Sequence, residues 1–213
     1  AQKSKASRIV VATDHEAVVT ALRGSNCETV MTSPELQSGT DRLASAAEYL
    51  ALDEGTIVVN LQGDEPLMPP ECLDEVADGL VRSNADMATL ACRFDSSEMP
   101  SDENSVKVVT TEEGRALYFS RALIPFDRDG IAVTGDAAYR RHIGLYAYRV
   151  NFLKEFVHWP CGQLENLEKL EQLRALQRGR SIQVLEAPRI VPPGVDTERD
   201  LAIARSHYQE LNK

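Results

Sequence analysis

The chain has 213 residues, 43% of them hydrophobic, which is enough for one domain with a sizeable core. Its formal net charge is −10 and no basic stripe runs along it, so a role in nucleic-acid binding is disfavoured. No apolar run approaches the roughly 18 residues that a membrane-spanning helix needs, and the first residues do not read as a signal peptide. The four scattered cysteines lack metal-type spacing and indicate free thiols in a cytoplasmic protein.

Strand-like and helix-like patterns alternate through the first half of the chain. We expect strands at 8–12, 27–31, 56–61 and 86–92, and helices from Asp14 to about Gly24, at 40–51 and at 70–83. Such alternation predicts an α/β fold, with parallel strands and helices on both faces of the sheet.

The second half is richer in β-structure. We expect a hairpin made by strands at 105–110 and 115–120, a loop at 126–138, a strand at 141–148, one long helix at 164–178, a strand at 181–186 and a closing helix at 197–211. Thr197 and Asp200 resemble a capping box at the start of the last helix. The whole chain, 1–213, is interpreted as one domain, with 105–160 as a β-rich subdomain inserted in it.

The stretch NLQGDEPLMPP, residues 60–70, is the first candidate site. It follows an apolar run at 56–59, so Asp64 and Glu65 stand at the carboxyl end of a buried strand, where open α/β sheets bind ligands. Gly63 permits close approach of the backbone. Paired carboxylates there can hold Mg²⁺, which prefers one or two carboxylates with phosphate oxygens and water. A turn into a solvated helix explains the same residues, because acidic side chains favour helix N-termini.

Three further stretches carry weaker signals. Residues 37–42, QSGTDR, open a helix whose free N–H groups, together with the Arg42 guanidinium, suit an anion or a base edge. A pair of arginines ending at Arg141 precedes a strand and can grip a carboxylate. Asp196 stands before the last helix, where it can face Asp64 across a metal ion or serve as an ordinary N-cap. Taken alone, the 37–42 stretch and the arginine pair are better explained by structural roles, and an N-cap explains Asp196 well.

Taken together, these stretches resemble the 3-deoxy-manno-octulosonate cytidylyltransferases, the CMP-Kdo synthetases. The matching motifs occur in order over nearly the whole chain: VATDHE (11–16), QSGTDRL (37–43), VVNLQGDEPL (58–67), ALYFSRALIPFDRD (116–129), RHIGLYAYR (141–149), LEKLEQLRAL (167–176) and GVDTERDL (194–201). The resemblance implies a three-layer α/β sandwich of the nucleotide-diphospho-sugar-transferase type, with a mostly parallel central sheet and a small subdomain for sugar binding and dimerisation.

The resemblance also implies a reaction. The C2 hydroxyl of the sugar acid Kdo attacks the α-phosphate of CTP, and pyrophosphate leaves, in a Mg²⁺-dependent step of lipopolysaccharide biosynthesis. CTP and Kdo are thus the expected substrates and a second copy of the chain the expected partner, with no nucleic acid and no membrane involved.

Family roles fall on particular residues of this chain. Asp64 and Asp196 are expected to be the catalytic, metal-binding pair. The expected nucleotide-binding residues are Ser38, Gly39, Thr40, Arg42, Gln62, Gly63 and Asp64. The expected sugar-binding residues are Gln62, Arg141, Glu168 and Glu171, the last two in a helix where Asn166 stands in place of a histidine found in some relatives.

Two departures from the family pattern are visible. The family begins with a strand and a phosphate-binding loop that holds the CTP triphosphate, and neither occurs in this sequence. We expect both to precede Ala1 in the complete protein, because a sheet without its first central strand exposes unpaired backbone groups. The loop at 130–138 is also shorter than in some relatives.

Three other functions stay open at this point. A sialic-acid cytidylyltransferase shares the fold and chemistry and differs in its sugar pocket, and the QGDEP and LEQLR patterns favour Kdo over it. A dinucleotide-binding oxidoreductase requires a G-x-G-x-x-G after its first strand, and no strand of this sequence carries one. A non-catalytic nucleotide-binding module is the expectation if the phosphate-binding loop is truly missing.

Overall fold

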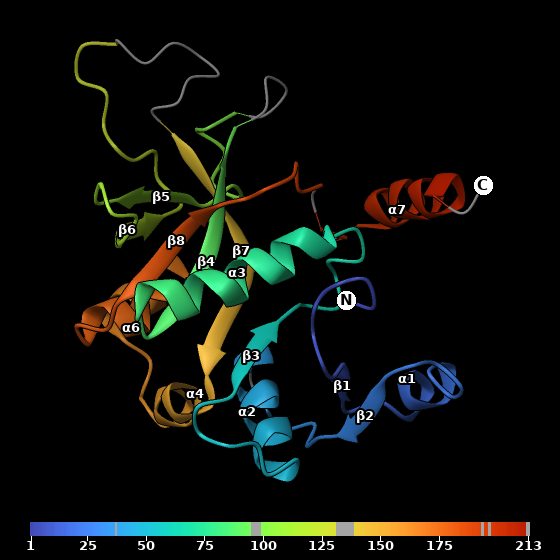
Figure 1. Cartoon of the computed structure of the whole chain (residues 1–213). Coiled ribbons are helices and arrows are strands. Elements are labelled where there is room, and N and C mark those ends of the chain that lie inside the picture. The colour runs from blue at the N-terminus through green and yellow to red at the C-terminus, as the bar shows by residue number, and fades with distance from the viewer. Residues whose placement is uncertain (37, 95–98, 131–138, 193, 196, 212–213) are drawn as a thin grey trace.

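The computed structural model describes residues 1–36, 38–94, 99–130, 139–192, 194–195 and 197–211. Strands and helices alternate through the first half of the chain, as the α/β pattern predicts, and consecutive strands follow in the middle (Figure 1). The elements are β1 (Val10–Thr13), α1 (Glu16–Ala21), β2 (Glu28–Met31), α2 (Gly39–Tyr49), β3 (Ile57–Asn60), α3 (Pro70–Ser83), β4 (Met87–Arg93), β5 (Lys107–Thr110), β6 (Ala116–Ser120), β7 (Arg140–Arg149), α4 (Val150–Val157), α5 (Gln163–Glu168), α6 (Leu173–Gln177), β8 (Ile182–Glu186) and α7 (Glu198–Leu211).

The strands form two sheets. β1 and β2 pair in parallel by themselves, and the larger sheet has six strands in the order β6-β5-β7-β4-β8, with β3 also paired to β7. β3, β4, β5 and β8 run in one direction, which agrees with the expected parallel character. Most of the pairing in this sheet is nevertheless antiparallel, which differs from the mostly parallel pairing expected. The reason is the ten-residue β7, which runs the opposite way and makes antiparallel ladders with β3, β4 and β5.

Two apolar clusters fill the space on the two faces of the large sheet. Alternate residues of a strand point to opposite faces, and β7 sends Leu145 and Ala147 into the cluster under α3 and Tyr148 into the cluster under α2 and α4. Helix α3 lies so close to β8 that a Cβ at Gly79 would stand 2.0 Å from a methyl carbon of Leu185. Any side chain at position 79 would therefore force Leu185 to move. The three-layer arrangement of helix, sheet and helix follows from these contacts.

The N-cap of the first helix lies one residue later than the expected Asp14. His15 holds that position, and its Nδ1 accepts a hydrogen bond from the Ala17 N–H at 3.2 Å. The Asp14 carboxylate instead pairs with the Arg42 guanidinium of α2 at 2.7 Å. The Asp14 side chain, which the sequence pattern predicted as a local helix cap, thus forms a tertiary ion pair instead.

The long helix expected at 164–178 is two short helices, α5 and α6. Lys169 ends α5 in the left-handed conformation with φ of 55°, so the helix cannot continue through it. The break turns Leu167 outward, with 74% of its surface exposed. It also brings α5 and α6 face to face, and the Arg174 guanidinium holds the Glu165 carboxylate through Nε at 2.8 Å and Nη2 at 2.6 Å.

Other local predictions hold. The Thr197 hydroxyl accepts the Asp200 N–H, and the Asp200 carboxylate accepts the Thr197 N–H at 2.9 Å, which is the expected capping box. The hairpin of β5 and β6 turns at Gly114, with φ of +80°. The strands within 105–160 belong to the six-stranded sheet, and their interpretation as an inserted subdomain stays a prediction. Within the described residues, no helix combines the length and apolarity needed to span a membrane.

Candidate functional site

The turn that follows β3 is held by its own backbone and by a distant segment. The Glu65 N–H donates to the Gln62 carbonyl at 3.2 Å and closes the turn, which leaves Asp64 exposed. The Val195 N–H donates to the Asp64 carbonyl at 2.7 Å. A Cβ placed on Gly194 would stand 3.2 Å from the same carbonyl oxygen. The QGDEP and GVDT motifs, far apart in the sequence, therefore meet at the carboxyl end of β3.

The predicted metal pair is placed only in part. Asp64 lies at this end of β3, and Val195 is hydrogen-bonded to Asp64. Asp196, the next residue, falls outside the described residues. The described residues contain no cluster of three or more His, Cys, Asp or Glu side chains arranged for a metal ion. Mg²⁺ needs only one or two carboxylates, since phosphate oxygens and water complete its shell. The exposed oxygen donor of Asp64 at a strand end fits such an ion.

The first turn of α2 lies against the same strand end. Ser38 caps the helix, and its hydroxyl accepts the Asp41 N–H at 3.1 Å. A Cβ on Gly39 would stand 2.6 Å from the Gln62 amide nitrogen, so the Gln62 side chain lies directly over the Gly39 backbone. Two stretches assigned to the nucleotide, 38–40 and 62–64, are thus in contact.

A buried polar cluster lies beneath this contact. Thr40 is 2% exposed, and its hydroxyl donates to the Glu171 carboxylate at 2.6 Å. The Tyr148 phenol lies against the side chains of Thr40 and Asn60, and burial raises its pKa far above the ordinary tyrosine value. Asn60 is the last residue of β3 and is itself buried. The cluster therefore joins α2, β3, β7 and the segment before α6.

Arg42, expected in the nucleotide pocket, is engaged within the protein. Its Nη1 donates to the Thr32 hydroxyl at 2.5 Å and its Nη2 to the Asp14 carboxylate at 2.7 Å. These contacts link α2 to the segments that follow β1 and β2. The role of Arg42 toward a ligand stays a prediction.

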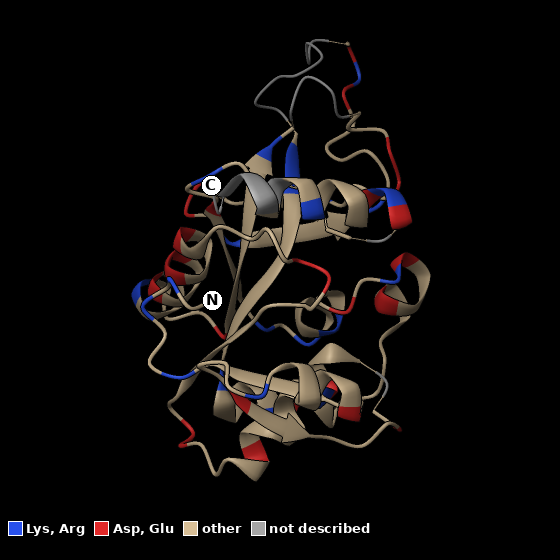
Figure 2. Ribbon diagram, turned by 90° about the vertical axis from the view of Figure 1, so that its right-hand side faces the viewer, with Lys and Arg blue, Asp and Glu red and all other residues tan. Residues whose placement is uncertain are grey.

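The predicted sugar ligands lie on the other strands. Arg141 is the second residue of β7 and pairs with Cys92 of β4, and its Nη2 donates to the Val191 carbonyl at 3.1 Å. Arg93 and Arg140 face each other in the next pair of this ladder, so basic residues gather at this end of β4 and β7 (Figure 2). Arg140 is paired with Glu186 at 2.6 Å, so the positive charge that a substrate carboxylate or phosphate would meet here comes from Arg93 and Arg141.

Glu168 has a structural set of partners. Its carboxylate accepts the Ser120 hydroxyl at 2.6 Å and the Arg121 N–H at 2.9 Å, and its backbone carbonyl accepts the Arg121 side chain at 2.8 Å. These bonds tie α5 to the end of β6. Glu171 is likewise bonded within the protein, to Thr40 and, at 3.5 Å, to Arg174. The sugar-binding roles given to both acids stay predictions.

His142, next to Arg141, is a structural residue. Its ring stands edge-on to Phe119 at 5.0 Å and its Nε2 lies 3.0 Å from the Thr89 hydroxyl. Burial lowers the pKa of His142 to about 3, and the nearby Arg141 charge adds to that effect. The imidazole is therefore neutral near pH 7, as expected for a packed histidine rather than a ligand.

Several residues of this region were missed by sequence reasoning. They are Asn60, Lys107, Tyr148, Glu165 and Arg174, all of which are buried polar or charged groups. Lys107, for example, is fully buried and donates to the carbonyls of Asp102 at 2.8 Å and Arg121 at 2.6 Å. The sequence signal for such residues is a polar side chain next to an apolar run. Asn60, after the run that starts at Ile57, is an example, and we interpreted it only as the end of a strand.

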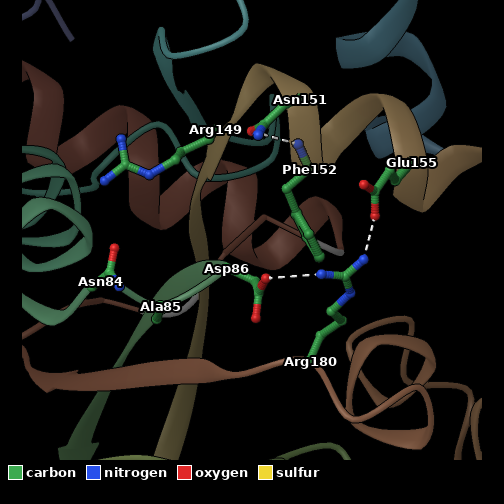
Figure 3. Close-up of a pocket in the computed structure, with 8 residues that line it drawn as sticks. All are labelled: Asn84, Ala85, Asp86, Arg149, Asn151, Phe152, Glu155 and Arg180. Atoms are coloured by element: carbon green, nitrogen blue, oxygen red, sulfur yellow. Dashed lines mark hydrogen bonds and ion pairs between the residues drawn. The ribbon is translucent and has the colours of Figure 1, made fainter.

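A surface pocket of about 270 Å³ lies at the opposite edge of the sheet, at the amino ends of β4 and β8. Figure 3 shows Arg180 between Asp86 and Glu155, paired to them at 3.4 Å and 2.5 Å. The Ser181 hydroxyl also donates to Asp86 at 2.7 Å. Because its acids are already neutralised and it lies far along the strands from Asp64, we place the functional site at the carboxyl end of β3.

The chain is similar to known proteins over most of its length. A family model described as cytidylyltransferase matches residues 1–182. Proteins named 3-deoxy-manno-octulosonate cytidylyltransferase are 46% identical in Haemophilus influenzae and 47% identical in Histophilus somni, each match covering 97% of this chain and 84% of the relative. The relative of the same name in Aeromonas salmonicida is 47% identical, over 97% of this chain and 85% of its own length.

A solved structure of CMP:2-keto-3-deoxy-manno-octonic acid synthetase complexed with CTP has the same fold. It superposes with a TM-score of 0.87 at 33% identity, over 98% of this chain and 84% of that one. The likeness supports the nucleotidyltransferase-type sandwich that the sequence motifs imply.

Proposed function

The chain belongs to the cytidylyltransferase family, and from that premise we propose that it transfers CMP from CTP to the anomeric C2 hydroxyl of Kdo, for lipopolysaccharide biosynthesis. Relatives that share almost half of its residues carry the name of this activity. The observation in the structure that supports it best is the 2.7 Å bond from the Val195 N–H to the Asp64 carbonyl, which joins the two acidic motifs.

The reaction is a displacement at phosphorus. The C2 oxygen of Kdo forms a bond to the α-phosphorus of CTP, the bond from that phosphorus to the bridging oxygen of the β-phosphate breaks, and pyrophosphate leaves with the electron pair. The C2 hydroxyl loses its proton in this step. Catalysis of such transfers rests mainly on positioning and on stabilising charge.

Residues of the described site divide this work. The half-buried residues Ser38 and Gly39 lie at the end of β3, where cytosine and ribose are expected to bind. Gln62 lies between this turn and Asp64, in reach of both substrates. Arg141 supplies a guanidinium for the carboxylate of the sugar acid, since an arginine fork matches a carboxylate.

We propose Mg²⁺ as the metal, held by Asp64 and Asp196. When bound, this ion neutralises charge on the phosphate oxygens and orients the attacking hydroxyl. The support is the oxygen-donor character of Asp64 and the contact of its turn with residues 194–195. A Mg²⁺ titration measured by isothermal calorimetry, on the wild-type protein and on Asp64→Asn, gives the contribution of Asp64 to that binding.

The test of the function is pyrophosphate release by the protein made from its complete gene. Each nucleoside triphosphate is offered with Kdo or with sialic acid in the presence of Mg²⁺. Release that needs both CTP and Kdo is the expected result. Release with sialic acid alone would overturn the sugar assignment, and absence of release with every pair would overturn the enzyme itself.

Asp64→Asn is the matched variant for this assay. It keeps the size of the side chain and removes the charge that a metal ion needs, so we expect turnover to fall at least a hundredfold with thermal stability retained. Full activity in a folded Asp64→Asn protein would remove Asp64 from the catalytic site.

We further propose a cytoplasmic homodimer. The four cysteines, Cys27, Cys72, Cys92 and Cys161, are all free, which suits a reducing compartment. Large apolar side chains are exposed at Leu117 of β6, to 59%, and at Phe126, to 84%. Covering such side chains in a contact between two copies would remove apolar surface from water.

A further inference from the structure

The Thr40 side chain cannot serve as a ligand for the nucleotide. It is 2% exposed, and its hydroxyl is committed to the Glu171 carboxylate at 2.6 Å, across 131 residues of sequence. A bond of that length between a hydroxyl and a carboxylate is a strong, charge-assisted one. Thr40 therefore influences the first turn of α2 through the protein and not through direct contact with a substrate.

Glu171 is in turn fixed from the side of α6. Its other carboxylate oxygen lies 3.5 Å from the Arg174 guanidinium, which is held firmly by Glu165. The side chains of Arg174 and Glu165 are each 10% exposed, so this pair is shielded from solvent and from salt screening. The Arg174 guanidinium also stacks over the Phe156 ring at 4.7 Å. The acceptor that receives Thr40 thus stands on a rigid support.

The opposite side of Thr40 is occupied by Tyr148. Its phenol lies between Thr40 and Asn60, the residue that leads into the turn carrying Gln62 and Asp64. Burial raises the pKa of this phenol, so it is protonated and able to donate a hydrogen bond at neutral pH. One buried cluster thereby touches both the first turn of α2 and the end of β3.

We propose that Thr40 and Glu171 are positioning residues, with Tyr148 as their support, and that they set the first turn of α2 at the height required for CTP beside Asp64. The proposal rests on the proposed cytidylyltransferase function and changes the role that the sequence gave to Glu171. Glu171 belongs to the segment expected to bind the sugar, but its carboxylate holds the nucleotide side of the site in place. Loss of the Thr40–Glu171 bond weakens CTP binding and leaves Kdo binding nearly unchanged.

The central experiment compares Thr40→Val with Thr40→Ser. Valine keeps the shape of threonine and removes the hydroxyl, and we expect it to raise KM for CTP about tenfold, since a hydrogen bond to a charged group is worth roughly that much or more. Serine keeps the hydroxyl and is expected to restore most of the wild-type KM. Equal KM values for CTP in the two variants would overturn the proposal.

Ser181→Ala is the matched control. It removes a hydroxyl-to-carboxylate bond of similar length, 2.7 Å to Asp86, at the opposite edge of the sheet (Figure 3 shows Asp86). We expect it to lower thermal stability as Thr40→Val does, with KM for CTP unchanged. If Ser181→Ala raised KM for CTP as much, the effect would follow from stability alone and the positioning role would be refuted.

Glu171→Ala separates positioning from sugar binding. A positioning role predicts a higher KM for CTP with KM for Kdo within about twofold of wild type. The reverse pattern, with only the Kdo KM raised, would make Glu171 a sugar ligand and overturn the proposal. Failure of the wild-type protein to form CMP-Kdo would instead refute the proposed function, so the two failures are distinguishable.

Discussion

Gly39 shows how one missing side chain shapes the site. It begins α2, where alanine is ordinarily the better helix residue. Its backbone is overlaid by the Gln62 side chain, and a Cβ there would stand 2.6 Å from the Gln62 amide nitrogen. The glycine is therefore explained by the position of Gln62 and not by any demand of the helix.

We predict that Gly39→Ala yields a stable protein with impaired catalysis. The new methyl group displaces Gln62 from both substrates, so kcat/KM should fall about tenfold or more, while the melting temperature is unchanged or slightly higher. Gly55→Ala is the control, because a Cβ at Gly55 meets nothing within 4 Å. Steady-state kinetics and thermal unfolding of the two variants measure this, and wild-type kinetics in Gly39→Ala would contradict it.

His142 gives the protein a pH dependence of stability that can be derived in sign. Its pKa is about 3 in the folded state, against roughly 6.5 in an unfolded chain. Between these values the unfolded state binds one proton more, so stability falls as pH drops from about 6.5 toward 3. The slope from this residue is at most about 1.4 kcal/mol per pH unit.

We predict that His142→Asn removes that component. Asparagine does not titrate and can still bond the Thr89 hydroxyl, so stability of the variant should depend less steeply on pH between 6 and 4. Urea unfolding of both proteins at several pH values gives the two slopes. Parallel curves would show that the histidine titrates alike in the folded and unfolded states.

At the scale of elements, the break between α5 and α6 decides how the sugar-side helices are oriented. At this break Lys169 has a left-handed backbone, with φ of 55°. This conformation costs a non-glycine residue roughly 1 kcal/mol. Gly179, at the end of α6, has a similar φ of 72° but carries no such cost. The two positions form a natural pair for a reciprocal test.

We predict that Lys169→Gly stabilises the protein by up to about 1 kcal/mol and that Gly179→Ala destabilises it by about the same amount. Nothing lies within 4 Å of a Cβ at Gly179, so backbone strain alone is tested there. Chemical denaturation measures both free energies of unfolding. Destabilisation by Lys169→Gly would indicate that the lysine side chain, rather than its conformation, matters.

Elements were predictable where the pattern of apolar residues is local. Helix α3, expected at 70–83, has those bounds, because its apolar residues repeat with helical period up to the cap at Asn84. The break at Lys169 was missed, since leucines continue at helical spacing through it. The helix stops at the left-handed Lys169, and beyond it Arg174 pairs with Glu165; a sequence pattern does not show which charges will meet.

The candidate site was predictable to the same extent. A carboxylate after an apolar strand marked Asp64, and its contact with residues 194–195 places the two acidic motifs together. The cluster of Thr40 with Glu171 could not be found in this way, because its members are 131 residues apart and each resembles an ordinary polar surface residue. Arg42 was likewise expected to face a ligand, whereas the fold gives it Asp14 and Thr32 as partners.

At the scale of the whole molecule, charge and apolar surface act against each other in self-association. Each chain carries a net charge of −10, so two copies repel at long range. The exposed side chains of Leu117 and Phe126 can offset that repulsion when they are covered. Because salt screens the charges and leaves the apolar contact intact, association should strengthen as ionic strength rises.

We predict a dimer, with twice the chain mass of 23.5 kDa, whose dissociation constant falls between low salt and about 0.15 M salt. Leu117→Glu should yield monomers, because it buries an unpaired charge in the contact. Val81→Glu is the control, since Val81 is similarly exposed, at 57%, on the outer side of α3. Sedimentation equilibrium measures all three proteins. A Leu117→Glu protein that stays dimeric, or a Val81→Glu protein that becomes monomeric, would place the interface elsewhere on the surface.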